Sequence, residues 1–221
     1  MKVEDIDRLS GHAAYHVIAE AHSTGMVDAF YRVRDRNESW VETQSPRTVR
    51  YLRDIREGKY RIQEEVLFNQ EEHRYRRHAY RIDKNTYENK EGAIPPHVMD
   101  ALGSLYYVRT LPLEVGKSYT VDVHSGDQVY PLIVNVKKHQ VIKVKAGKFD
   151  CLLVEPQLRA PGIFISKGKK LEVWLTADER HLPILMRSEV FIGHVSAELV
   201  KIHTVPPAET AQLLHATSAV R

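Results

Sequence analysis

Apolar and polar residues alternate with a period of two along most of this chain. The alternation is clear over residues 13–21 and returns over residues 27–33. Because successive side chains of a β-strand point to opposite faces, it predicts strands with one buried and one solvated face. Turns are expected at 35–37 and, as a tight hairpin, at 57–58. The first half, residues 12–93, is therefore predicted to form a meander of roughly seven strands.

The second half, residues 110–203, follows the same pattern. Its connections are too short for crossovers between parallel strands, so we expect antiparallel pairing throughout. The predicted strands cover residues 119–123, 129–136, 141–144, 149–154, 163–165, 171–175, 184–190 and 195–202.

One segment between the two halves departs from the two-residue period. Its first residues are prolines, which fit the first turn of a helix because that turn needs no N–H donors. A lone amphipathic helix among strands must bury its apolar stripe against a sheet. We therefore predict a helix over residues 95–109 that lies on the strands. Its apolar stripe consists of Val98, Leu102, Leu105 and Tyr106, and Arg109 suits its C-terminal end.

These patterns predict a mainly β fold, either a strongly curved antiparallel sheet or an open β-barrel, made of two meander halves with one central amphipathic helix packed on it. Residues 12–203 are expected to form a single domain, with residues 1–11 as an N-terminal extension. Residues 204–221 are expected to be a flexible tail or a short helix. The N-terminus lacks the apolar segment of a secretory signal, so either the protein is cytoplasmic or its leader has been removed.

Composition narrows the classes of function. The 221 residues include 32 basic and 29 acidic ones, a net charge of +3 that is too balanced to favour a nucleic-acid partner. No apolar run is long enough to span a membrane. The single cysteine, Cys151, allows neither an internal disulfide nor a multi-cysteine zinc site, and we expect it to be a small buried apolar residue.

Three histidines, His12, His16 and His22, fall on the solvated face of the first predicted strand. Neighbours four residues apart on a strand lie about 13 Å apart, too far to share one metal ion, so a solvated face is the preferred interpretation. The basic and aromatic segment 73–81 has two interpretations. Ion pairing with the glutamates just upstream is the simpler one, and anion binding is the alternative.

The predicted helix also places Asp100, Ser104 and Tyr107 on one face. They could line a pocket, but a structural role is preferred, with Asp100 near the positive end of the helix and Ser104 allowing a close approach to the sheet. Glycine-rich phosphate loops, nucleophile elbows and metalloprotease motifs are absent from the sequence. We therefore expect no catalytic residues, no bound metal and no cofactor.

Several ordered motifs resemble an uncharacterised family of bacterial exported proteins, domain of unknown function 3108. They are DIREGKY at 54–60, DALGSLYYVR at 100–109, LEVGKSY at 113–119, AGKFDC at 146–151 with VEP at 154–156, and GKKLEVWLTADERHLP at 168–183. The resemblance covers about residues 12–203. It implies a periplasmic or outer-membrane-associated protein of the cell envelope. By analogy of strand and turn style, the family is also similar to periplasmic lipoprotein carriers.

The leading hypothesis for function is a non-enzymatic envelope protein that binds a lipid or other apolar molecule in a groove of its curved sheet. The expected ligand-binding residues are Val98, Leu102, Leu105, Tyr106 and Arg109. The alternative is a scaffold that recruits an envelope protein through exposed strand edges. A third hypothesis, an enzyme acting on envelope polysaccharide, would need two facing carboxylates, and its candidates are Glu20, Asp28 and Glu172.

Overall fold

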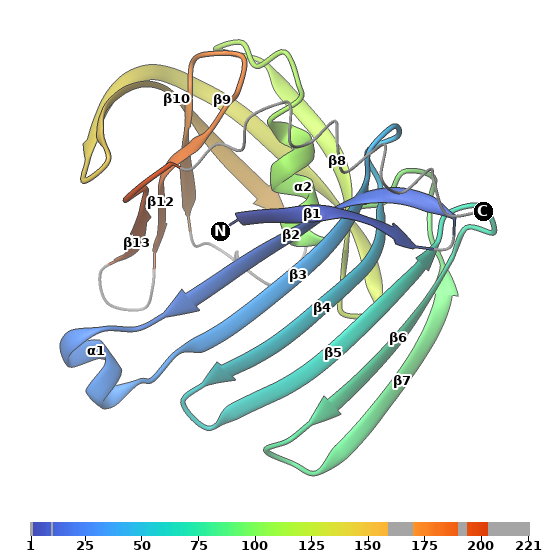
Figure 1. The fold of residues 1–221 in the computed structure, drawn as a ribbon. Helices are drawn as coiled ribbons and strands as arrows, with labels where there is room; N and C mark the ends of the chain where they lie inside the picture. The colour runs from blue at the N-terminus through green and yellow to red at the C-terminus, as the bar shows by residue number, and fades with distance from the viewer. Residues whose placement is uncertain (1, 10, 159–169, 190–193, 203–221) are drawn as a thin grey trace.

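The chain folds into two antiparallel sheets with a short helix between them (Figure 1). The computed structural model describes residues 2–9, 11–158, 170–189 and 194–202. The predicted strand at 163–165 and the predicted tail at 204–221 lie outside the described residues. The prediction of a mainly β fold of two meander halves around one central helix is confirmed, and the two sheets are not closed into a barrel.

The first half forms a seven-stranded sheet in which the strands follow one another in chain order. The predicted alternation is clearest along β5, where Ile62, Glu64, Val66 and Phe68 are buried and the residues between them are more exposed. The strands are β1 (Lys2–Leu9), β2 (His12–His22), β3 (Arg34–Glu42), β4 (Thr48–Glu57), β5 (Tyr60–Asn69), β6 (Arg74–Arg81) and β7 (Thr86–Ala93).

The second half forms a six-stranded sheet, also a meander of neighbouring strands. Its long central pair, β9 and β10, carries most of its core, including Val134, Val136, Leu152 and Val154. The strands are β8 (Ser118–Ser125), β9 (Gln128–Val144), β10 (Gly147–Leu158), β11 (Leu171–Thr176), β12 (Pro183–Glu189) and β13 (His194–Glu198).

Helix α2 (Ala101–Val108) connects the two sheets and contacts both. Val98 and Leu102 join the apolar cluster of the seven-stranded sheet, while Leu105 packs against the cluster of the six-stranded sheet. Most of the apolar stripe predicted for the helix thus lies in one core, and Leu105 lies in the other.

The helix begins later than residue 95, where we predicted it. The backbone of Val98 and Met99 is already paired with the sheets, because Val98 O accepts the Thr48 N–H at 3.2 Å and Met99 N donates to Asp122 O at 2.9 Å. These long-range bonds hold the segment extended, and Asp100 then caps the helix. Contacts with strands distant in sequence outweighed the local signal from the prolines.

Residues 27–33 were predicted as a strand, but residues 25–30 form helix α1 (Gly25–Phe30). The Ser23 hydroxyl donates to Asp28 at 2.6 Å and accepts the Val33 N–H at 2.8 Å. Arg34 closes the connection with two hydrogen bonds to Asp28. Local side-chain bonds of this kind compete with strand pairing.

Two further differences concern the edges of predicted elements. The predicted turn at 35–37 is wrong, because β3 runs through it and pairs with β2 and β4 along these residues. Residues 2–9, which we placed in an N-terminal extension, form β1 and pair with β2. The tight turn at 57–58 is confirmed, and Gly58 adopts a φ of 56°, a conformation that glycine reaches without steric cost.

Candidate functional site

The residues predicted to bind an apolar ligand lie at the interface of α2 with the two sheets. Val98 is fully buried and Leu102 nearly so, and both pack in one cluster with Tyr106. Leu105 faces the other cluster. The guanidinium of Arg109 lies 4.9 Å from the Tyr106 ring and donates to the Arg180 carbonyl at 3.2 Å. The structure thus brings four of the five residues near one another, and ligand binding by them stays a prediction.

Asp100 holds α2 against the seven-stranded sheet. One of its carboxylate oxygens accepts the N–H groups of Leu102 and Gly103 at 2.7 and 2.9 Å. The other oxygen accepts the hydroxyls of Ser39 and Thr48. Complete burial raises the pKa of Asp100, although these hydrogen bonds act in the opposite direction. All four partners belong to the fold itself, which supports the structural interpretation of Asp100 over a pocket-lining one.

Gly103 and Ser104 allow the close approach of α2 to the sheet. A Cβ atom on Gly103 would lie 2.9 Å from the Thr48 hydroxyl and 3.1 Å from a Val41 methyl group. The hydroxyl of Ser104 is directed back to its own helix, where it donates to the Ala101 carbonyl. The side of α2 that carries Gly103 and Ser104 therefore packs against the seven-stranded sheet.

The seven-stranded sheet has two faces, which we call the helix-side face and the outer face. The helix-side face shares an apolar cluster with Leu102 of α2, and this cluster includes Tyr51 and Val66, which pair across β4 and β5. Their chain neighbours Leu52 and Glu65 also pair with one another and point the other way, onto the outer face. The alternation of the strands therefore separates the polar residues of the outer face from the helix.

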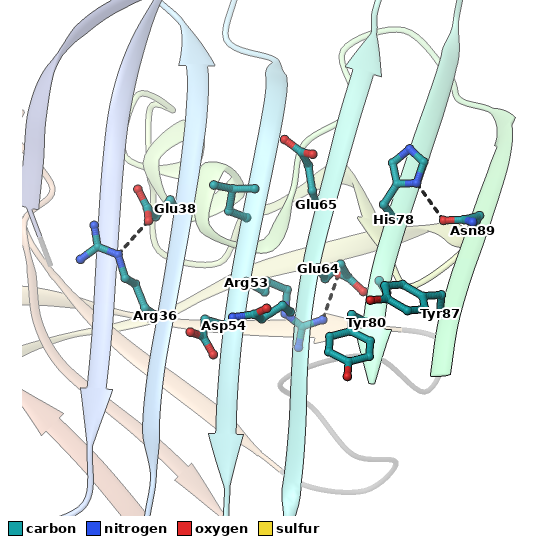
Figure 2. Close-up of a pocket in the computed structure, with 13 residues that line it drawn as sticks. Arg36, Glu38, Arg53, Asp54, Glu64, Glu65, His78, Tyr80, Tyr87 and Asn89 are labelled. Carbon is teal, nitrogen blue, oxygen red and sulfur yellow. Dashed lines mark hydrogen bonds and ion pairs between the residues drawn. The ribbon is translucent and has the colours of Figure 1, made fainter. Parts of the chain in front are cut away.

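A pocket of about 550 Å³ lies along β3 to β7 (Figure 2). By strand register, most of its lining side chains belong to the outer face. A volume of several hundred cubic ångströms is typical of small-molecule sites. The outer-face lining residues are Arg36, Glu38, Leu52, Asp54, Gln63, Glu65, His78, Tyr80, Tyr87 and Asn89, and Arg53, Glu64 and Ala79 complete the pocket.

The carboxylates of this pocket are already compensated by cations. Glu65 pairs with Arg50 at 2.7 Å, and Asp54 pairs with Arg56 at 2.7 Å. Glu38 accepts from Arg36 at 2.7 Å. The pocket therefore offers hydrogen-bonding groups without a large excess of either charge.

Two tyrosines form the aromatic edge of the pocket. The rings of Tyr80 and Tyr87 stack with centroids 4.5 Å apart and an angle of 18° between their planes. The hydroxyl of Tyr80 donates to Asn85, and Tyr87 is 75% exposed. His78 and Asn89, on the same two strands, are joined at 2.8 Å. An exposed flat ring beside amide and imidazole groups can bind a ligand that combines apolar C–H surface with hydroxyl groups.

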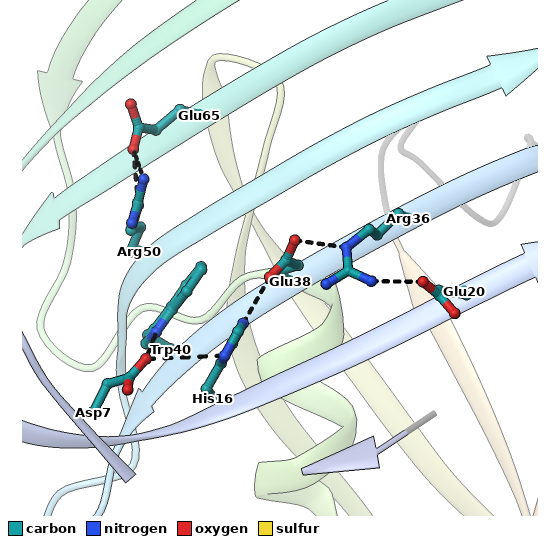
Figure 3. A network of polar contacts seen from close by, with 8 residues as sticks. All are labelled: Asp7, His16, Glu20, Arg36, Glu38, Trp40, Arg50 and Glu65. Carbon is teal, nitrogen blue, oxygen red and sulfur yellow. Dashed lines mark hydrogen bonds and ion pairs between the residues drawn. The ribbon is translucent and has the colours of Figure 1, made fainter. Parts of the chain in front are cut away.

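A stacked row of side chains borders the pocket on β2 to β4 (Figure 3). The His16 ring lies 4.1 Å from the Trp40 ring and nearly parallel to it, and the Arg50 guanidinium lies 4.9 Å from the same ring. Trp40 Nε1 donates to Asp7 of β1 at 2.7 Å. Partial burial opposes the charge of Glu38, but hydrogen bonds from Arg36 and His16 outweigh it and lower the pKa of Glu38. These contacts fix one wall of the pocket.

The other two histidines discussed from the sequence lie apart from this row. His12 lies 3.1 Å from Glu42, and His22 is exposed at the end of β2. Over the described ranges, no three His, Cys, Asp or Glu side chains gather as a metal ion would require.

The helix-side face carries its own buried charges. Glu64 accepts from Arg77 at 2.7 Å and from Arg53 at 3.3 Å. The Glu64–Arg77 pair confirms the ion-pairing interpretation for Arg77 within segment 73–81.

His124 of β8 is 2% exposed and packs on Phe68 and Tyr75. Burial lowers the pKa of His124 to about 4.

Cys151 lies fully buried on β10, and burial raises the pKa of its thiol to about 11. A thiol that stays protonated at neutral pH is a poor nucleophile.

The three carboxylates proposed as candidates for an enzyme are not brought together. Glu20 pairs with Arg36, Asp28 pairs with Arg34, and Glu172 lies on the other sheet beside Lys170.

The outer-face pocket was missed from the sequence, although part of its signal was present. The turn after β6 sets the register in which Tyr80 faces Tyr87 and His78 faces Asn89. Recognising the turn at 82–85 would have paired these residues. The contributions of β3 and β4 depend on registers set by longer connections.

None of the helices in the described residues is long and apolar enough to cross a membrane. A search of the curated proteins found no match, and neither did a search of the solved structures. A family model described as "Protein of unknown function (DUF3108)" matches residues 1–200, so the chain belongs to this family.

Proposed function

We propose that this protein is a non-enzymatic binding protein of the bacterial cell envelope that holds an uncharged, sugar-like ligand in its outer-face pocket. The observation that carries the proposal is the pocket of about 550 Å³, in which paired charges lie beside two stacked tyrosines, of which Tyr87 is exposed. The envelope location rests on the resemblance of the motifs to exported proteins.

Charge pairing is the reason for an uncharged ligand. A ligand carboxylate or phosphate would have to compete with Glu65 for Arg50 or with Asp54 for Arg56. A ligand cation would have to remove the same partners from the carboxylates. Hydroxyl groups can instead add hydrogen bonds to oxygen and nitrogen atoms that keep their present partners.

The tyrosine pair is the reason for a ring-shaped ligand. Tyr87 offers a flat, solvent-facing ring beside His78 and Asn89. A pyranose presents one face of C–H groups and a rim of hydroxyls, so it can cover the ring and reach the polar side chains at once. Binding of this kind needs no covalent chemistry.

The apolar-ligand hypothesis is the second candidate, favoured by the position of α2 between two apolar clusters. A lipid there would have to displace Val98 and Leu102 from side chains that they already contact. We therefore rank it below the outer-face pocket. Organic-solvent extraction of the purified protein followed by mass spectrometry tests it, because a stoichiometric lipid would reverse the ranking. Recruitment of an envelope protein through a sheet edge stays a prediction.

The test of the proposal is saturation-transfer NMR with a panel of neutral and acidic mono- and disaccharides. We expect neutral sugars to bind and Tyr87→Ala to weaken binding about tenfold, the loss of one aromatic contact. Tyr15→Ala is the matched control, because Tyr15 is an exposed tyrosine outside the pocket lining. Preference for acidic sugars, no binding by any sugar, or an equal loss in Tyr15→Ala would each contradict the proposal.

A further inference from the structure

Three connections of the seven-stranded sheet meet at one of its ends. They are the α1 connection at 23–33, the β4–β5 turn with the start of β5 at 58–61, and the β6–β7 turn at 82–85. We call these residues the hairpin rim. Figure 1 shows the rim at the end of the sheet that projects away from the six-stranded sheet.

Backbone contacts make the rim one continuous edge. Gly58 N donates to the Arg32 carbonyl at 2.9 Å, and Ile82 N donates to the Arg61 carbonyl at 3.0 Å. The Tyr31 ring lies so close to Gly58 that a Cβ atom there would be 2.9 Å from it. Side chains of the three connections are therefore neighbours along a single surface.

The rim exposes aromatic residues. Phe30 is 89% exposed, the highest value among the large apolar residues whose exposure is described, and Tyr31 and Tyr60 of the same rim are exposed to a smaller degree. One exposed apolar residue is ordinary on a protein surface. Phe30 therefore indicates a binding surface only together with the charged residues of the same rim.

The cations of the rim outnumber the carboxylates available to them. Lys59, Arg61 and Lys84 are exposed and have no ion-pair partner within the part of the chain that the structure describes. Of the carboxylates close to them, Asp28 is bonded to Arg34 at 2.6 Å and Asp83 to Arg81 at 2.8 Å, while Glu57, next to Gly58, accepts a hydrogen bond from Tyr31 and lies against Asp35. The rim that carries Phe30 therefore also carries three cations without an ion-pair partner among the described residues.

We propose that the hairpin rim docks the protein onto an anionic lipid surface. Phe30 would enter the boundary between headgroups and acyl chains, and Lys59, Arg61 and Lys84 would lie against the lipid phosphates. Aromatic residues among cations are typical of interfacial membrane contacts. The α1 connection presents Phe30 in a fixed direction, because Ser23, Asp28 and Arg34 bond it internally. This proposal does not depend on the ligand of the outer-face pocket.

Co-sedimentation with vesicles tests the proposal, using phosphatidylglycerol–phosphatidylcholine mixtures and pure phosphatidylcholine at low salt. We expect the full chain to bind only the anionic vesicles, and added salt to release it. The triple variant Lys59→Gln, Arg61→Gln, Lys84→Gln should weaken binding about a hundredfold, since each cation near the surface is worth about fivefold. Phe30→Ser should weaken binding about tenfold.

The six-stranded sheet offers matched controls. Lys138, Lys143 and Lys148 are exposed lysines without an ion-pair partner in the described ranges, so Lys138→Gln, Lys143→Gln, Lys148→Gln removes the same charge elsewhere. Val141→Ser removes an exposed apolar side chain there. Both controls should bind as the unaltered protein does. Equal loss in the control triple would show unspecific charge attraction and overturn the proposal.

A spectroscopic variant locates the contact independently. Phe30→Trp should fold normally because the site is exposed, and the two native tryptophans are buried. We expect its fluorescence to shift to the blue with anionic vesicles and to be quenched by brominated lipids. No binding of the unaltered protein to anionic vesicles, equal binding to pure phosphatidylcholine, or an unchanged spectrum of this variant would overturn the proposal.

Discussion

The two faces of the seven-stranded sheet both carry charge, but they place it in different surroundings. Glu64, on the helix-side face, has a side chain that is 2% exposed and lies between Arg77 and Arg53. Glu65, the next residue, lies on the outer face and pairs with Arg50 with both side chains about one-third exposed. A buried charge depends on its partner, whereas an exposed pair contributes little to stability. Neighbouring residues of one strand can thus serve stability and binding separately.

The same contrast holds for the polar contacts of the two faces. On the helix-side face Asp100 is completely enclosed, and its hydrogen bonds join α2 to the sheet. On the outer face His78 and Asn89 bond to one another at the surface. Substitutions on the first face should therefore change the free energy of unfolding, and substitutions on the second should change ligand binding.

The largest expected effect is that of Glu64→Ala. It leaves the buried guanidinium of Arg77 without its nearest carboxylate, which should cost about 4 kcal/mol of unfolding free energy. Urea denaturation measures the loss. The matched control is Glu88→Ala, because Glu88 also pairs with Arg77 but is 46% exposed, and it should cost less than about 1 kcal/mol. Equal losses in the two variants would remove the distinction between buried and exposed partners.

Asp100→Ala should have the next largest effect. It removes the helix cap, worth about 1 kcal/mol, and leaves buried hydroxyls of Ser39 and Thr48 without their acceptor, for a total of about 3 kcal/mol. Asp100→Asn keeps an oxygen for the helix N–H groups and should lose about 1 kcal/mol. Urea denaturation of both variants checks this order. A loss in Asp100→Ala no larger than in Asp100→Asn would show that the cap does not depend on these contacts.

Helix α2 shows which features of the fold could be predicted from the sequence and which could not. The stripe of Val98, Leu102 and Tyr106 was sufficient to predict a helix buried on the sheet. Its starting residue could not be predicted, because the backbone partners of Val98 and Met99 belong to Thr48 and Asp122, far away in the chain. Likewise, α1 depends on bonds from Ser23 to Asp28 and Val33 that an alternating pattern does not encode.

The outer-face pocket was harder to predict for a geometric reason. The proximity of Tyr80 and Tyr87 follows from one short turn, but Leu52 and Glu38 reach the pocket only through the register of β3 with β4. That register shifts between Trp40 and Val41. Since one irregularity changes which residues face one another, alternation alone predicts the two faces and not the site.

His124 extends the comparison to pH. Burial lowers its pKa to about 4 from an ordinary value of 6.5. Between these pH values the unfolded chain therefore binds more protons than the folded chain. The contribution of neutral His124 to the free energy of unfolding is complete above pH 6.5 and is lost as the pH falls toward 4. The free energy of unfolding should fall by about 3 kcal/mol over this range.

Unfolding measured from pH 7 to 4 checks this prediction with two variants. His124→Phe should remove this part of the pH dependence. His78→Phe, on the outer face, should keep it, because His78 is exposed and bonded to Asn89. If both variants flatten the profile equally, burial on the helix-side face is not its cause.

The smallest expected effect is that of Glu65→Gln. Its partner Arg50 keeps its position over the Trp40 ring and remains partly solvated, so the free energy of unfolding should change by less than about 0.5 kcal/mol. Neutral-sugar binding, by contrast, should weaken measurably because Glu65 lines the pocket. Urea denaturation and saturation-transfer NMR on the same variant separate the two effects. A stability loss as large as that of Glu64→Ala would mean that outer-face charges also hold the fold, and their pairing would then no longer argue for a ligand site.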